Sequence, residues 1–190
     1  MSCITAAELA IPGVKLLHPR RIADERGFFS ETYNQRVFSD AGIDIGWIQD
    51  NHAISTERGV IRGLHYQAPP HAQTKLVRVV RGAIHDVVVD LRANSPAFGQ
   101  WLSVNLSADN WAQLLVPAGC AHGYMVLEPH SEVLYKVDRE YARDAEAGIR
   151  WNDPDLAIDW PLSAGVPIVS KKDQELPLFK NLATPFVNDD

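Results

Sequence analysis

Two histidines and a lysine stand at defined distances from turn residues of this chain. His65 lies six positions after a glycine, and Lys75 lies seven positions before Gly82. His122 closes a P-x-G-x-x-H pattern that begins at Pro117. An imidazole is a common metal ligand and also an acid or base near neutral pH. The spacing alone therefore leaves three interpretations open: a metal site, acid–base catalysis, or histidines that only fill the interior of a barrel.

These spacings resemble the two motifs of the cupin superfamily, whose fold is a double-sheet jelly roll. In metal-binding cupins the first motif supplies His-x-His and a later glutamate, and the second motif supplies one more histidine. Here Gln67 takes the place of the second histidine, and Lys75 takes the place of the glutamate. A protonated lysine offers no lone pair and repels a cation. We therefore expect a cupin-like fold without a metal.

The elements that must position these residues are mostly strands. Short apolar and β-branched segments recur about every 8–12 residues, a pattern typical of an antiparallel sandwich or barrel. The sequence therefore predicts an all-β fold, a double-sheet jelly roll or cupin-like β-barrel with a few short helices. The expected strands cover residues 76–80, 87–89, 101–106, 114–116, 124–127 and 133–135.

Helical signals are few. Residues 35–41 follow Asn34, a favourable N-cap, and precede Gly42, so they predict one short helix. Ser170 and Asp173 have the spacing of a capping box and predict a second short helix, in which Asp173 could serve only as part of the cap. The remaining C-terminal third is rich in Trp, Pro and Asp, and we expect irregular structure packed against the barrel.

The composition fits a single domain over residues 1–190. Hydrophobic residues make up 46% of the chain and charged residues 22%, which is ordinary for a globular protein. The net charge of −6 argues against binding to nucleic acid or a membrane surface, although a few clustered arginines could bind an anionic substrate. We expect neither a membrane span nor a signal peptide. Cys3 and Cys120 make no disulfide framework, so we expect the reducing cytoplasm.

A closer resemblance extends from residue 24 to residue 173. Short blocks stand here in the order found in the dTDP-4-dehydrorhamnose 3,5-epimerase family, and the ordered set is far more specific than any single block. The blocks are DERGFFSE at 24–31, QDNH at 49–52, RGLHYQ at 62–67, KLVR at 75–78, SPAFGQW at 95–101, AHG at 121–123, LYK at 134–136, WND at 151–153 and SKKD at 170–173.

The resemblance implies an epimerase that inverts C3 and C5 of a dTDP-linked 4-keto-6-deoxy hexose, turning dTDP-4-dehydro-6-deoxyglucose into dTDP-4-dehydrorhamnose. It also implies a homodimer and no metal or organic cofactor. Four residues match catalytic positions: His65 as the proton-abstracting base, Asp173 as the carboxylate that orients it, Tyr135 as the acid on the opposite face, and Lys75 beside the enolate oxygen. The resemblance implies substrate binding by Arg26, Glu31, Gln49, Asp50, Asn51, Arg62, His122, Glu146 and Lys172, with Glu146 the loosest match.

The chemistry agrees with these residue types. Protons at C3 and C5 flank the C4 ketone, so removal of either leaves an enolate, and a neutral imidazole suits that step. A carboxylate fixes the imidazole tautomer. A cation held at the developing oxyanion contributes roughly 3–4 kcal/mol.

Other functions remain open at this point. An epimerase acting at C3 only or C5 only could keep every residue named above. A ketoisomerase more often has two histidines at the base position, which Gln67 argues against. A metal-dependent cupin oxygenase is disfavoured by Gln67 and Lys75, and a non-catalytic sugar-nucleotide binder has no need of a base, an acid and an orienting carboxylate. The sequence assigns no nucleotide base, no sharing of the site across a dimer, and no role to Cys120 or His85.

Overall fold

The computed structural model describes residues 4–162 and 165–187, and two sheets dominate it. Apart from β14, which is parallel to β6, the paired strands are antiparallel. The first sheet has the order β1 (Ile4–Glu8), β2 (Lys15–Pro19), β10 (Gln113–Val116), β7 (Lys75–Arg81), β12 (Ser131–Val137) and β5 (Gln49–Ser55). The second has the order β13 (Glu146–Gly148), β6 (Val60–Gln67), β11 (Cys120–Val126), β8 (Ala83–Asp90) and β9 (Trp101–Ser107), with β14 (Ile168–Val169) beside β6.

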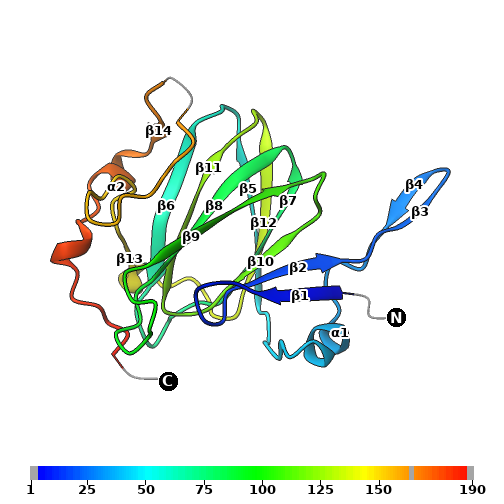
Figure 1. The fold of residues 1–190 in the computed structure, drawn as a ribbon, viewed down its shortest axis with the longest axis horizontal. Helices are drawn as coiled ribbons and strands as arrows, with labels where there is room; N and C mark the ends of the chain where they lie inside the picture. Colours follow the sequence, from blue (N-terminus) through cyan, green and yellow to red (C-terminus); the bar gives the residue numbers. More distant parts are fainter. Residues whose placement is uncertain (1–3, 163–164, 188–190) are drawn as a thin grey trace.

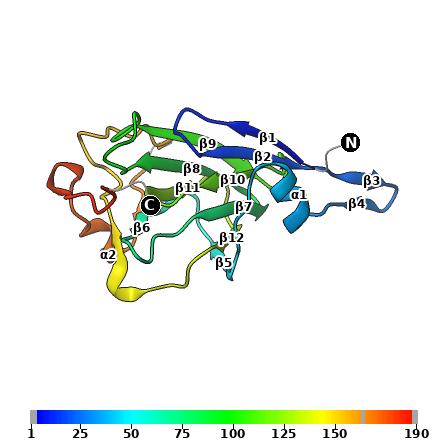
Figure 2. The ribbon, with the colours of Figure 1, turned by 90° about the horizontal axis from the view of Figure 1, so that it is seen from below.

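The two sheets form a jelly-roll-like double sheet (Figures 1 and 2). This confirms the predicted fold class. Each sheet is hydrogen-bonded separately in the described part of the chain, so the sheets do not close into one continuous barrel.

Alternating apolar residues of the two sheets make the core between them. Val77, Val79 and Val133 come from the first sheet and Val88 and Val126 from the second, and each is at most 2% exposed. Because side chains alternate between the faces of a strand, short β-branched runs predicted these strands well. All six predicted strands overlap strands of the sheets, and each observed strand is longer because the hydrogen-bonded ladders continue past the predicted ends.

Both predicted helices are present. The side chain of Asn34 accepts the Val37 N–H at 3.3 Å and caps α1 (Gln35–Asp40), which covers the outer face of the first sheet with Phe38. Ser170 Oγ accepts the Asp173 N–H at 3.1 Å and caps α2 (Lys171–Gln174). Two 3₁₀ turns complete the described helices: η1 (Arg143–Ala145) and η2 (Phe179–Asn181).

The C-terminal third covers the outer face of the second sheet. It consists of short elements and loops, as predicted, and its Trp160 and Phe186 pack in one cluster with Val87 and Val89 of β8. Within the part of the chain that the structure describes, no helix has the length and apolar character needed to cross a membrane.

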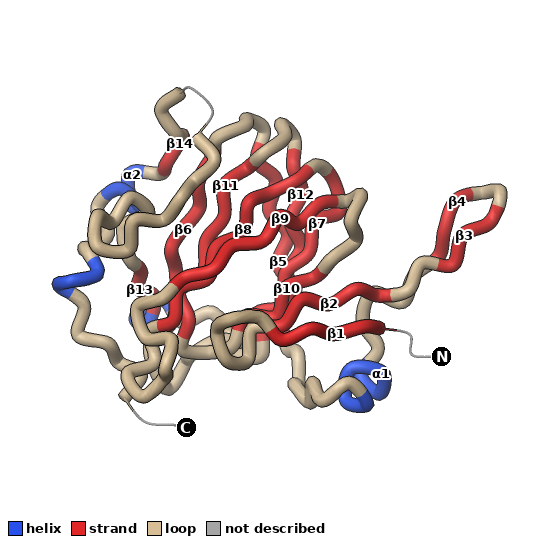
Figure 3. The backbone as a smooth tube through the Cα atoms, viewed as in Figure 1, coloured by secondary structure: helices blue, strands red, loops and turns tan. Residues whose placement is uncertain are grey.

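A small hairpin that the sequence did not predict projects away from the double sheet. It is formed by β3 (Ile22–Asp24) and β4 (Gly27–Phe29), and we call it the arm (Figure 3). Ile22, Phe28 and Phe29 of the arm are 55%, 48% and 65% exposed. The arm therefore presents apolar side chains that its own chain covers only in part.

Candidate active site

A cavity of about 570 Å³ lies between the sheets beside α2. Its volume is in the usual range of small-molecule sites. Its polar lining consists of Arg62, His65, Lys75, His122, Tyr124, Tyr135, Ser170, Lys172 and Asp173. Seven of the predicted site residues thus share one cavity, although they come from five elements of the fold.

His65 and Asp173 form a pair across 108 positions of sequence, with His65 Nε2 2.7 Å from Asp173 Oδ1. Asp173 is 4% exposed, and the Gly63 N–H donates to its other oxygen at 3.2 Å. Burial raises the pKa of Asp173, but the hydrogen bond and charge of His65, with the Gly63 and Ser170 donors, outweigh burial and hold that pKa below its usual value. An ionised carboxylate only accepts, so the proton of His65 sits on Nε2 and Nδ1 is the free base.

The local backbone explains how this carboxylate comes to face the histidine. Ser170 caps α2, which leaves the Asp173 side chain free to reach β6. Gly63 has a φ of +121°, and a Cβ there would lie 2.6 Å from the Cα of Gly123 on β11. A glycine at position 63 therefore allows β6 to approach β11 closely, and the backbone N–H of Gly63 faces Asp173. The interpretation of Asp173 as only a cap is wrong.

Lys75 brings a cation into the cavity from the first residue of β7. Its Nζ donates to the backbone oxygen of His65 at 3.4 Å. Burial lowers the pKa of Lys75 to about 8, while the negative charges of Asp86 and Glu146 act in the opposite direction. A lysine at the start of a strand is usually solvated, so its position inside the cavity is a result of the tertiary fold.

His122 makes a second histidine–carboxylate pair. It lies opposite His65 in the register of β11 and β6, and its Nε2 is 2.9 and 3.0 Å from the two carboxylate oxygens of Asp86. Asp86 is fully buried, and sequence reasoning missed it. The available signal was a carboxylate directly before the apolar run Val87–Val89 of β8, because a buried charge needs a partner.

Tyr135 lies on the wall opposite His65, because β12 belongs to the first sheet and β6 to the second. Burial raises the pKa of Tyr135; the Arg62 charge lowers it and the Glu146 charge raises it further. Burial also raises the pKa of Tyr124, to about 12. Both phenols are therefore protonated at neutral pH, and Tyr124 is a cavity residue that the sequence did not single out.

Charged residues gather where the cavity opens. The Arg62 guanidinium donates to Ser55 Oγ and to a backbone oxygen of β5. Lys172 Nζ lies 2.6 Å from a carboxylate oxygen of Glu146, to which the hydroxyl of Tyr141 also donates at 2.8 Å. Glu146 is thus tied to a cavity residue without lining the cavity itself, and Tyr141 is a neighbour that sequence reasoning left unassigned.

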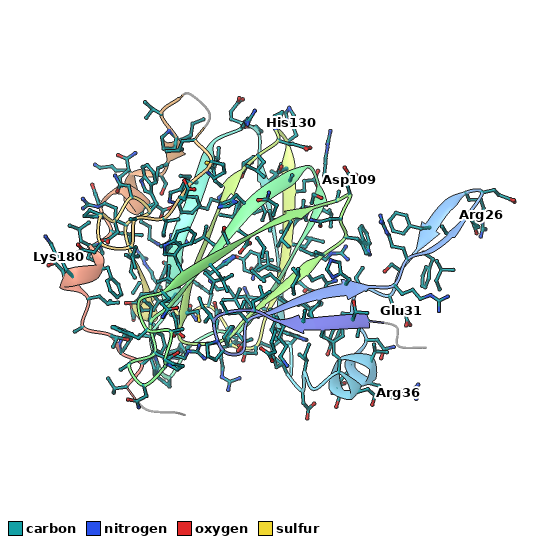
Figure 4. All side chains as sticks on the ribbon, viewed as in Figure 1. Arg26, Glu31, Arg36, Asp109, His130 and Lys180 are labelled. Carbon is teal, nitrogen blue, oxygen red and sulfur yellow. The ribbon has the colours of Figure 1, made fainter. Side chains whose placement is uncertain are left out.

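Five further predicted binding residues lie outside the cavity lining. Gln49 and Asn51 share a face of β5 with Ala53, which does line the cavity, whereas Asp50 points to the other face and pairs with Lys136 at 2.8 Å. Arg26 and Glu31 lie at and beside the arm, far from the cavity of their own chain. Figure 4 labels both on the side from which the arm projects.

Gln67, which stands at a metal-ligand position of the cupin motif, and Cys120 both have roles outside the cavity. The Gln67 amide donates to the backbone oxygens of His71 and Glu140 and accepts the Ala142 N–H. Its hydrogen bonds therefore hold together the two loops beside β6. Cys120 is 3% exposed and burial raises its pKa to about 12, so it is a small buried side chain.

His85 Nδ1 lies 2.9 Å from Asn105 Oδ1, and His85 is not part of the cavity lining. Cys3 lies outside the described residues. Across residues 4–162 and 165–187, no group of three or more His, Cys, Asp or Glu side chains is arranged to hold a metal ion.

Fold and cavity together define a cupin-class protein equipped for proton transfer at a carbon beside a carbonyl. The model of the dTDP-4-dehydrorhamnose 3,5-epimerase family matches residues 8–181. A dTDP-4-dehydrorhamnose 3,5-epimerase of Pseudomonas aeruginosa is 52% identical over 171 residues, which is 90% of this chain and 93% of that protein. The chain belongs to the dTDP-4-dehydrorhamnose 3,5-epimerase family.

Solved structures agree with this membership. The crystal structure of dTDP-4-dehydrorhamnose 3,5-epimerase from Bacillus anthracis, with TDP and PPi bound, has a TM-score of 0.89 and 51% identity, covering 92% of this chain and 99% of that one. The epimerase RmlC from Legionella pneumophila, in complex with dTDP-4-keto-L-rhamnose, has a TM-score of 0.90 and 39% identity, covering 97% of each chain. The protein is thus an isomerase of the class that the sequence predicted.

Proposed function

We propose that the protein inverts C3 and C5 of dTDP-4-dehydro-6-deoxyglucose, giving dTDP-4-dehydrorhamnose, with the residues of the cavity in the roles that the sequence predicted. The observation that supports these roles best is the placement of the His65–Asp173 pair and Tyr135 on facing walls of one cavity. A sugar ring between the two walls has a base on one face and an acid on the other.

The proposed reaction proceeds through two proton transfers at each carbon. His65 Nδ1 takes the proton from C3 or C5, the C–H electron pair forms a C=C bond, and the C4 oxygen becomes an enolate oxygen. Lys75 stabilises that negative charge with its ammonium group. The Tyr135 hydroxyl then protonates the same carbon from the opposite face, and the ketone reforms. His65 returns its proton to solvent and Tyr135 regains one, so no net proton is consumed.

The charged mouth of the cavity is the proposed site for the nucleotide diphosphate. Arg62 and Lys172 supply positive charge there, and charge-assisted hydrogen bonds to phosphate are stronger than neutral ones. The relative from Bacillus anthracis was crystallised with TDP and PPi bound, which supports a site for the same chemical groups here. Inside the cavity, Asp86 binds His122 through Nε2, which leaves His122 Nδ1 to accept a hydrogen bond from a sugar hydroxyl.

We propose a single domain over residues 1–190 that acts as a homodimer, in which the arm of each subunit reaches the cavity of the other. The exposed apolar side chains of the arm support a protein partner. Arg26 and Glu31 match binding positions of the family but lie away from the cavity of their own chain (Figure 4). We place the protein in the cytoplasm, where the free thiol of Cys120 stays reduced.

Mixing two inactive variants tests the exchange of arms. A His65→Ala chain keeps a working arm, and an Arg26→Ala chain keeps a working cavity. If arms act across the dimer, dissociating and reassociating the mixture restores sites that have both parts. Activity that stays at the level of the separate variants, in a mixture shown to contain heterodimers, would mean that the arm serves its own chain.

Product analysis in deuterated water tests the function itself. Incubation with dTDP-4-dehydro-6-deoxyglucose should place solvent deuterium at both C3 and C5 and yield dTDP-4-dehydrorhamnose. Deuterium at one carbon only would make the protein a single-site epimerase. Binding without exchange at either carbon would make it a sugar-nucleotide binder.

A further inference from the structure

Ser55 lies behind the cavity wall and contacts the arginine at its mouth. It is the last residue of β5, is 5% exposed, and does not line the cavity. Its Oγ accepts a hydrogen bond from Arg62 Nε at 3.1 Å, and the adjacent backbone oxygen of Ile54 accepts one from Arg62 Nη2 at 3.0 Å. When two neighbouring nitrogens of a planar guanidinium each donate to a fixed acceptor, the guanidinium is held in one orientation.

The two contacts leave the rest of the Arg62 guanidinium available. A guanidinium carries five N–H donors, and both hydrogen bonds that Arg62 makes within the described residues go to β5. Arg62 is itself exposed and lines the cavity. Its remaining donors can therefore meet a ligand that enters from solvent.

The same serine hydroxyl also reaches the cavity wall. Tyr124 is 6% exposed and lines the cavity, and burial raises its pKa while the Ser55 hydroxyl lowers that pKa slightly. The Ser55 hydroxyl thus joins a buried phenol to a charged group at the cavity mouth.

We infer that Ser55 is a positioning residue, whose hydroxyl holds Arg62 in the orientation that binds the diphosphate of the substrate before the substrate arrives. This inference rests on the proposed function, because the diphosphate is the anion that the proposed substrate brings to Arg62. A side chain that is already ordered loses less conformational entropy when it binds, and that difference appears as affinity.

The first test is the Ser55→Ala variant, measured for turnover and for binding of dTDP. KM and the dissociation constant of dTDP should both rise about three- to tenfold, the effect of leaving one long side chain free to move, while kcat stays unchanged. Ser131→Ala is the matched control. Ser131 is also a buried serine, lies directly opposite Ser55 in the β5–β12 register, and bonds only to backbone groups away from Arg62.

A double-mutant cycle separates positioning from general damage. In an Arg62→Ala background, Ser55→Ala should cause no further loss of dTDP affinity, because there is no guanidinium left to hold. An equal loss in both backgrounds, or a similar loss in Ser131→Ala, would overturn the inference. So would unchanged affinity in Ser55→Ala.

A measurement without ligand keeps this test independent of the proposed function. Wild-type protein that fails to bind dTDP would refute the proposed function, and the ¹⁵Nε–H signal of Arg62 then decides about Ser55. That signal is assigned by its loss in Arg62→Ala. It should show slow exchange with water in the wild type and fast exchange in Ser55→Ala. Equal exchange in the two proteins would refute the positioning role.

Discussion

Replacing Asp173 by asparagine removes one acceptor from a site that needs two. In the structure, Oδ1 faces His65 Nε2 at 2.7 Å and Oδ2 accepts the Gly63 N–H at 3.2 Å. An asparagine has one oxygen and one NH₂ group. The backbone N–H of Gly63 can only donate, so the asparagine oxygen must face Gly63 and its NH₂ must face His65. His65 then accepts at Nε2, and its remaining proton moves to Nδ1.

The expected loss follows from this change of tautomer. Removing a hydrogen bond to a charged group costs about 1.5–3 kcal/mol, which corresponds to roughly 10- to 150-fold in rate. A histidine held in the wrong tautomer has a much larger cost, about 10⁴-fold in the Ser-His-Asp template. We therefore expect kcat of Asp173→Asn to fall by about 10²- to 10⁴-fold, and to fall at C3 and C5 together because one base serves both carbons.

The assay follows deuterium incorporation at each carbon by NMR, with Asp153→Asn as a matched control. Asp153 is a buried carboxylate of the same C-terminal third and accepts only backbone N–H groups, among them that of Phe179 at 2.7 Å. It does not line the cavity, so its replacement should lower thermal stability more than catalysis. A folded Asp173→Asn protein with kcat within tenfold of the wild type would refute the tautomer argument. Slowing at one carbon alone would show that a second base exists.

Four further outcomes are expected. His65→Ala should abolish both exchange and epimerisation, whereas Tyr135→Phe should still exchange deuterium but with retention, or with inversion at one carbon only; substantial epimerisation by His65→Ala would remove it as the base. Arg62→Ala should raise KM about tenfold to a hundredfold or more with a smaller change in kcat, as expected for one lost charge-assisted contact to phosphate. A large fall in kcat at constant KM would show instead that Arg62 stabilises the transition state. Lys75 is proposed to act in its protonated form, so kcat should fall as the pH rises through about 8, where its lowered pKa lies. Lys75→Arg should move this decline to higher pH. An identical pH profile of kcat in the variant would contradict the role of Lys75 as the cation at the enolate oxygen. Treatment with a strong chelator should leave turnover intact, and activity that disappears and returns with Zn²⁺, Fe²⁺ or Mn²⁺ would overturn a metal-free mechanism.

Much of the fold followed from the sequence because its signals are local. Short apolar and β-branched runs that recur about every 8–12 residues predicted six of the strands, and Asn34 and Ser170 predicted both helix starts from single side chains. The arm was missed because each of its strands has three residues, too few to show an alternating pattern. Its hydrophobic residues also face solvent within one chain, so burial gives no hint of them.

The site divides in the same way. The ordered motifs were sufficient to single out His65, Lys75, His122 and Tyr135, all of which line the cavity, because a resemblance in sequence preserves residue types and their order. Asp86 was missed because it belongs to no motif, and its meaning appears only when β8 and β11 pair and bring it to His122.

The sequence by itself determined which groups are available: a histidine for the proposed base, a tyrosine for the proposed acid, a lysine in place of a metal-ligating glutamate, and an arginine for the proposed anion site. Only the tertiary structure decided how they act together. It brings Asp173 to His65 across 108 residues and places Tyr135 on the opposite wall. It also buries Lys75 enough to lower its pKa to about 8. The order of residues in the sequence records neither the distance between residues far apart in the chain nor the solvent exposure of each. The strength and direction of proton transfer depend on both.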